Sequence, residues 1–138
     1  MVHTESFTLS AKGFCDIFDI TGKVADAVAH SGIANGTVTV FCPGSTCAVT
    51  TIEYEQGVLR DLRRAIEELV PQDREYEHDK MWGDGNGFSH VRAALLKPSL
   101  AIPLIGKRLA LGRWQQVVFL DFDNRERRRE IIVQVVGE

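Results

Sequence analysis

The order of helix and strand patterns is the feature that most limits the fold. The period of the apolar residues indicates two strands, a helix, two strands, a helix, a polar loop, a helix and four strands. Helices and strands do not alternate regularly, and 138 residues are too few for a barrel of eight strand–helix units. We predict an α+β fold: a single domain over residues 1–138 with a mixed or antiparallel sheet and the helices on one face.

The segments follow from alternation, helical spacing and turn residues. Strands are predicted over 3–10, 14–20, 37–42, 46–54, 99–105, 108–111, 114–122 and 130–136. The first helix should follow Thr21 as N-cap and end at Ser31-Gly32, and the other two should cover 57–70 and 89–97. Residues 72–90 form a long polar loop with three glycines, and loops of that length are usually functional or disordered.

Charge and cysteine content narrow the possible partners and compartments. Lys and Arg number 16 and Asp and Glu 19, so the net charge of −3 argues against nucleic acid as a partner. There is no apolar run of about 18 residues and no signal-like start, which predicts no membrane span. Three cysteines without a C-x-x-C pair favour the cytoplasm. Four arginines within 125–129 form either a solvated turn or an anion site.

Two histidines flank the glycine-rich turn of the long loop. His78 and His90, with acids nearby, fit either a divalent metal site with an open position or an acid/base pair. Two histidines in a polar loop are nevertheless more often not ligands. If a helix begins near Asn86, its free N–H groups and Ser89 could hold a phosphate, although an ordinary helix start explains the same residues. The turn has no nucleotide-binding fingerprint.

Several ordered motifs resemble those of the YjbQ family of small conserved proteins, over nearly the whole chain. They are TTIEYE (50–55), NGFSH (86–90), LGRWQ (111–115) and a tail with Ser99 to Pro103, Gly106, Asp121, Asp123, Arg127 to Arg129 and Gly137-Glu138. Two features depart from the family pattern. Arg113 replaces the usual Thr before Trp, and the strand over 46–54 lacks the H-T-(S/T) and N-E-N motifs of many members.

The resemblance implies a homotrimer with pockets near subunit boundaries. It also implies a candidate activity, because some members act as a secondary thiamine-phosphate synthase, which joins a pyrimidine diphosphate to a thiazole phosphate. Within that scheme the catalytic group would be His78, His90 and Glu53, with a divalent metal, Mg²⁺ or Zn²⁺, on the two histidines. Phosphate and substrate contacts would come from the remaining site residues. These are Asn86, Ser89, Trp114 and Gln115.

Other interpretations of the same residues stay open. Trp114 also suits a core position, and Glu53 suits a solvated strand position. For the whole protein, the alternatives to a transferase are a non-catalytic trimer that binds a ligand or metal, and a metal-dependent hydrolase that uses the same histidines and Glu53.

Overall fold

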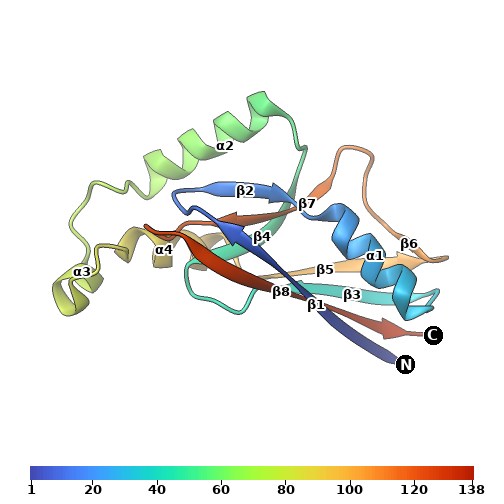
Figure 1. Ribbon diagram of the computed structural model, residues 1–138. Coiled ribbons are helices and arrows are strands. Elements are labelled where there is room, and N and C mark those ends of the chain that lie inside the picture. The colour runs from blue at the N-terminus through green and yellow to red at the C-terminus, as the bar shows by residue number, and fades with distance from the viewer.

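Eight strands and four helices make up the structure (Figure 1), a computed structural model that describes residues 1–138. In chain order they are β1 (Val2–Ala11), β2 (Asp16–Asp19), α1 (Thr21–Ser31), β3 (Gly36–Phe41), β4 (Cys47–Ile52), α2 (Gln56–Leu69), α3 (Glu77–Trp82), α4 (Gly87–Leu96), β5 (Ser99–Ile105), β6 (Arg108–Leu109), β7 (Gln116–Asp121) and β8 (Arg127–Gly137).

The strands form two sheets, and every pairing is antiparallel. The larger sheet has the order β1-β8-β3-β5-β6, and the smaller has the order β2-β7-β4. The predicted α+β class is therefore confirmed. The division into two sheets was not predicted, because alternation shows that a segment is a strand but not which strand it pairs with.

Strand β7 explains how the layers stack, because both of its faces are buried. Val117 and Phe119 pack with α1 and the inner face of the five-stranded sheet. Val118 and Leu120 face the opposite way and pack with α2 and α4. The three-stranded sheet thus lies between the larger sheet and these two helices.

The outer face of the five-stranded sheet carries no helix. Along β3, Val38 and Val40 point into the core, whereas Thr37 and Phe41 are exposed on the other side. Helices α1, α2 and α4 pack on the inner side of this sheet, which confirms the prediction that helices cover one face.

Three local predictions were wrong. The loop over 72–90 contains α3, whose six residues are too few to show a helical period. The strand predicted to 54 ends at Ile52, and Glu55 instead caps α2 by accepting from the N–H groups of Gly57 and Val58. Thr21 lies inside α1 because Asp19 accepts bonds from both its N–H and its hydroxyl group.

Helix length and the cysteines also bear on the predictions. The longest helix, α2, has 14 residues, and none of the four combines the length and apolarity needed to span a bilayer.

All three cysteines are free and buried. Burial raises the pKa of the Cys15 thiol to about 11, so this residue serves as a small apolar core residue.

Candidate functional site

The glycine-rich turn brings α3 and α4 together. Gly83 ends α3 in the left-handed conformation (φ +70°) and donates to the carbonyl of Asp79. Gly87 opens α4, and its N–H donates to Oδ1 of Asp79 at 2.9 Å. A Cβ on Gly87 would lie 2.6 Å from Cβ of Tyr76, so only glycine allows this close approach.

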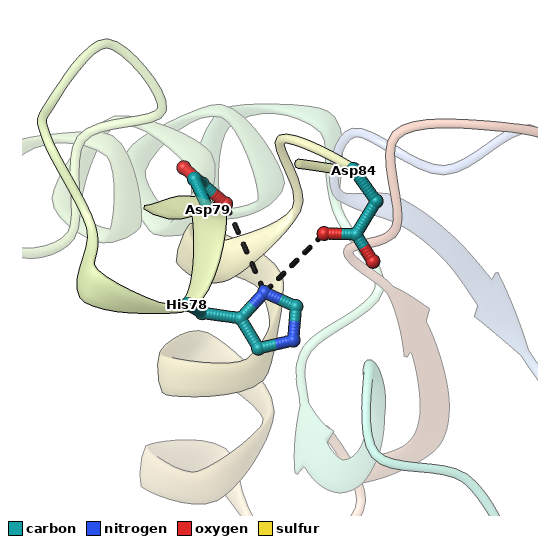
Figure 2. Close-up of side chains that lie close together, drawn as sticks. All are labelled: His78, Asp79 and Asp84. Carbon is teal, nitrogen blue, oxygen red and sulfur yellow. Dashed lines mark ion pairs between the residues drawn. The ribbon is translucent and has the colours of Figure 1, made fainter. Parts of the chain in front are cut away.

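His78 and two aspartates converge at this turn (Figure 2). Nδ1 of His78 lies 3.4 Å from Oδ1 of Asp84 and 3.8 Å from Oδ1 of Asp79. The three ligand atoms all lie within 4.8 Å of one another, and Nδ1 of His78 is buried without a hydrogen-bond partner. One imidazole and two carboxylates are ligands for Mg²⁺ or Zn²⁺, so these residues fit a divalent cation. We call His78, Asp79, Asp84 and His90 the histidine–aspartate cluster.

The second predicted histidine, His90, lies against His78. The two ring centroids are 4.3 Å apart and the ring planes are tilted by 40°. Burial, followed by the neighbouring His78, lowers the pKa of His90 below its usual value, against the opposing effect of Asp123 and the cluster aspartates. At pH 7 the His90 ring is therefore neutral and able to accept a proton.

Asn86 and Ser89 lie at the start of α4, directly after the glycine-rich turn. The hydroxyl of Ser89 is fully buried and donates to the carbonyl of Asn86. The Asn86 amide donates through Nδ2 to Oδ1 of Asp123 at 3.2 Å, while its own Oδ1 is buried without a partner. As placed, Asn86 therefore offers an acceptor rather than a donor.

Asp123 ties this helix start to the turn between β7 and β8. Its carboxylate is buried and accepts from Asn86, Thr46 and Arg127, with the Arg127 Nε at 2.9 Å. Burial opposes ionisation, but hydrogen bonds from the Asn124 main chain, Asn86 and Thr46 and the charge of Arg127 hold the pKa of Asp123 below its usual value. Asp123 is therefore a fixed buried anion.

A second buried carboxylate, Asp121, pairs with Arg129. Nε of Arg129 lies 2.7 Å from Oδ2 of Asp121, and Nη2 lies 3.0 Å from Oδ1. Nη2 also donates to the hydroxyl of Thr46, so Thr46 joins the two aspartates. This bidentate ion pair joins the end of β7 to the start of β8.

Two of the other predicted site residues line a cavity away from the histidine–aspartate cluster. Glu53 and Trp114 line a cavity of about 420 Å³ together with Asp19, Tyr54 and Gln116. Trp114 is 62% exposed, so it is not a core aromatic.

Neighbouring residues shape this cavity. The amide of Gln115 donates to the Thr51 hydroxyl and accepts from the Gly112 N–H, and Gln115 does not line the cavity. The guanidinium of Arg113 lies 4.9 Å above the ring of Trp114. The departure from the family's Thr at this position therefore places a cation on the exposed tryptophan.

One chain cannot bring the two groups of predicted residues together. Thr46 precedes β4 and donates to Asp123, which binds Asn86 beside the cluster, whereas Glu53 follows β4. With a rise of about 3.3 Å per residue, the two ends of this strand lie about 20 Å apart. His78 and His90 in the cluster, and Asn86 and Ser89 at the adjoining start of α4, therefore lie at one end, and Glu53, Trp114 and Gln115 lie at the opposite end.

Sequence reasoning missed the roles of Asp121, Asp123 and Thr46. A signal was available, because two aspartates close a strongly apolar strand, VVFLDFD, and arginines follow within eight residues. Acids in a strand buried on both faces need partners of opposite charge, and the arginine group supplies them.

Comparison with protein families gives one clear match. A family model described as UPF0047 protein YjbQ-like matches residues 5–138. A UPF0047 protein of Archaeoglobus fulgidus is 38% identical over 125 residues, covering 91% of this chain and 95% of that protein. A UPF0047 protein of Methanothermobacter thermautotrophicus is 36% identical over 137 residues, covering 99% and 94%.

Solved structures of other proteins have the same fold as this chain. A hypothetical protein from Aeropyrum pernix superimposes with a TM-score of 0.91 at 32% identity, covering 98% of both chains. A YbjQ-like protein of unknown function from Sulfolobus solfataricus gives 0.90 at 27% identity over the full length of both chains. The overall fold is thus shared with these proteins over nearly the whole chain.

Proposed function

The chain belongs to the YjbQ-like UPF0047 family, and we propose that it is a metal-dependent enzyme that acts on a small phosphorylated molecule. The observation that carries this proposal is the convergence of His78, Asp79 and Asp84, whose ligand atoms lie within 4.8 Å of one another. Mg²⁺ or Zn²⁺ is the cation that this ligand set suits. When bound, such a cation would neutralise charge on a phosphate or a leaving diphosphate.

The specific reaction in this proposal is that of a secondary thiamine-phosphate synthase. The bond between the pyrimidine methylene carbon and the diphosphate oxygen breaks, and the electron pair leaves with the diphosphate. The thiazole nitrogen forms the new bond to that carbon. The protein's task is to orient two substrates and to stabilise the departing charge, which needs cationic groups at fixed positions.

Arg127 is a suitable cation for the phosphate. Its Nε is bound to the buried Asp123, while the rest of its half-exposed guanidinium has no protein partner. Asp123 also holds Asn86, so the guanidinium lies near the start of α4. In this proposal Asn86 and Ser89 fix the helix start, and Arg127 contacts the phosphate beside the cluster.

A metal-dependent hydrolase is the second candidate. The neutral His90 ring beside His78 favours it, because a neutral imidazole next to a cation site can accept a proton from attacking water. The two candidates differ in whether water or the thiazole nitrogen attacks.

The first test is thiamine phosphate formation by the purified protein. We expect turnover with Mg²⁺ and none after chelation, and His90→Ala should lower the rate by about 10–100-fold, as loss of a group flanking a metal ligand usually does. His30→Ala, an exposed histidine paired with Glu5, is the matched control and should keep the full rate.

The results of that assay decide among the synthase, the hydrolase and a non-catalytic binder, and decide the role of His90. Absence of turnover by the wild type, with phosphate release from simple monoesters, would replace the synthase by the hydrolase. Neither activity, together with stabilisation by metal or phosphate, would make the protein a non-catalytic binder. Equal rates for His90→Ala and wild type would remove His90 from the mechanism.

We also propose a homotrimer in the cytoplasm, where three free buried thiols stay reduced. The cavity of Glu53 and Trp114 lies at the far end of β4 from the cluster, so it can serve the same substrate only if a neighbouring subunit supplies it. This arrangement would complete each site with residues from two chains.

Mixed trimers test the shared site. Glu53→Ala and His90→Ala should each be weak alone, and subunit exchange at equal amounts should restore about a quarter of the wild-type rate, because that fraction of boundaries receives both intact residues. Light scattering checks that the mass is three times the 15.4 kDa chain. A mixture no more active than its components would place the whole site within one chain.

A further inference from the structure

A second cavity, lined by none of the predicted site residues, lies between α1 and the turn after β5. It has a volume of about 430 Å³, within the range of about 300–1,000 Å³ that is typical of small-molecule sites. Figure 1 shows α1 alongside β6, and the cavity lies between them. We call it the α1–β6 groove.

The lining of the groove is aliphatic. Ala25 and Val28 come from one stripe of α1, and Leu109 and Leu111 come from β6 and the segment after it. No aromatic side chain lines it, so the groove has no surface on which a planar ring would stack. An aliphatic chain is the ligand type that such a lining accommodates.

Two cationic side chains without an ion-pair partner lie at the same groove. Lys107 and Arg108 line it, both are exposed, and neither forms an ion pair with a carboxylate. The main chain holds them in place, because the Lys107 N–H donates to the Ala34 carbonyl and Gly106 donates to Oδ1 of Asn35. These bonds fix the main chain of the turn, so two cations without an ion-pair partner remain beside an aliphatic cavity in a protein of net charge −3.

From these contacts we infer that the α1–β6 groove binds a small anionic amphiphile, an aliphatic carboxylate whose chain lies along α1 and whose head group contacts Lys107 and Arg108. Apolar surface supplies most of the binding free energy, and the two cations select the charged head. The groove is remote from the cluster: Thr21 lines it beside Val117, at the opposite end of β7 from Asp121. The groove shares no lining residue with the cavity of Glu53 and Trp114, although its Thr21 is hydrogen-bonded to Asp19 of that cavity.

Sodium decanoate, kept below its micelle-forming concentration, is the probe. Titration of the full-length, isotope-labelled protein should give saturable NMR shifts confined to residues 21–28 and 107–111. Ala25→Trp, on an exposed helix position, should fill the groove and abolish these shifts. The double variant Lys107→Gln/Arg108→Gln should weaken decanoate binding by about tenfold and leave decanol binding unchanged, because only the charged head loses its partners.

Arg113→Gln is the matched control, since it removes an exposed cation outside the groove and should leave decanoate affinity unaltered. The inference is overturned if decanoate does not saturate, if Ala25→Trp binds it as well as wild type, or if Arg113→Gln weakens binding as much as the double variant. It is also overturned if Ala25→Trp dissociates an oligomer, because a second copy of the chain would then cover the groove.

Discussion

Replacing Asp121 by alanine should lower the free energy of unfolding by about 3–5 kcal/mol, the usual cost of removing one partner from a buried ion pair. Asp121 is fully buried and holds Arg129, whose side chain is only 11% exposed. Without the carboxylate, the guanidinium keeps its hydrogen bond to the Thr46 hydroxyl, but its remaining carboxylate contact is the more distant one with Asp123, at 3.7 Å. Urea denaturation of wild type and variant measures the difference.

Two further variants separate the ion pair from simple loss of volume. Asp61→Ala removes an exposed carboxylate paired with Arg64 and should cost less than about 1 kcal/mol. Asp121→Ala/Arg129→Met removes both charges and should recover part of the loss, since no unpaired charge remains. A double variant as unstable as the sum of its single variants would show that the two side chains are not energetically coupled.

The same network makes stability depend on pH. Because the folded state lowers the pKa of Asp123, its contribution is fully present above the unfolded value of about 4 and is lost as the pH falls through the lowered pKa. Asp123→Asn should therefore flatten the decline in unfolding free energy of the wild type below about pH 4.

The second large effect concerns His78. His78→Ala should reduce affinity for Zn²⁺ or Mg²⁺ by more than the roughly 10–100-fold that loss of an outer partner causes, because it removes the imidazole from the cluster itself. Calorimetric titration measures the affinity. Thermal unfolding gives an independent readout: at 100 times Kd, metal should stabilise the wild type by about 2.7 kcal/mol and leave the variant unchanged.

His3→Ala is the matched control for this experiment. His3 has the same exposed fraction as His78, 30%, and also contacts a carboxylate, that of Glu5 at 2.7 Å. It lies on β1, away from the cluster, and its loss should not alter metal affinity. Unchanged metal binding by His78→Ala, or no binding by the wild type, would show that the cluster is only a set of neighbouring polar side chains.

The fold was predictable to the level of its class and most of its segments. Alternating apolar residues located the strands, and Pro71 and Pro98 marked the ends of α2 and α4. The two-sheet arrangement was beyond local patterns, because it depends on which strands pair across more than a hundred residues. Strand β7 was the best clue, since its run VVFL is apolar on both faces.

The site was predictable where its residues lie close in sequence. His78 and His90 meet because one glycine-rich turn joins their helices, and that turn is visible in the sequence. Asp121, Asp123 and Arg129 come from a distant part of the chain, so only the sheet register brings them to the same place. The position of Glu53 depended on where β4 ends, and strand ends are the least predictable part of a pattern.

The position of β8 has a consequence for how the chain can fold during synthesis. This strand, residues 127–137, lies between β1 and β3 and pairs with both, so Val2 is opposite Val136. Until the ribosome has released those residues, β1 has no partner and β3 lacks one neighbour. The larger sheet therefore closes only after residues 127–137 have left the ribosome, and until then the apolar faces of β1 and β3 stay open to chaperones.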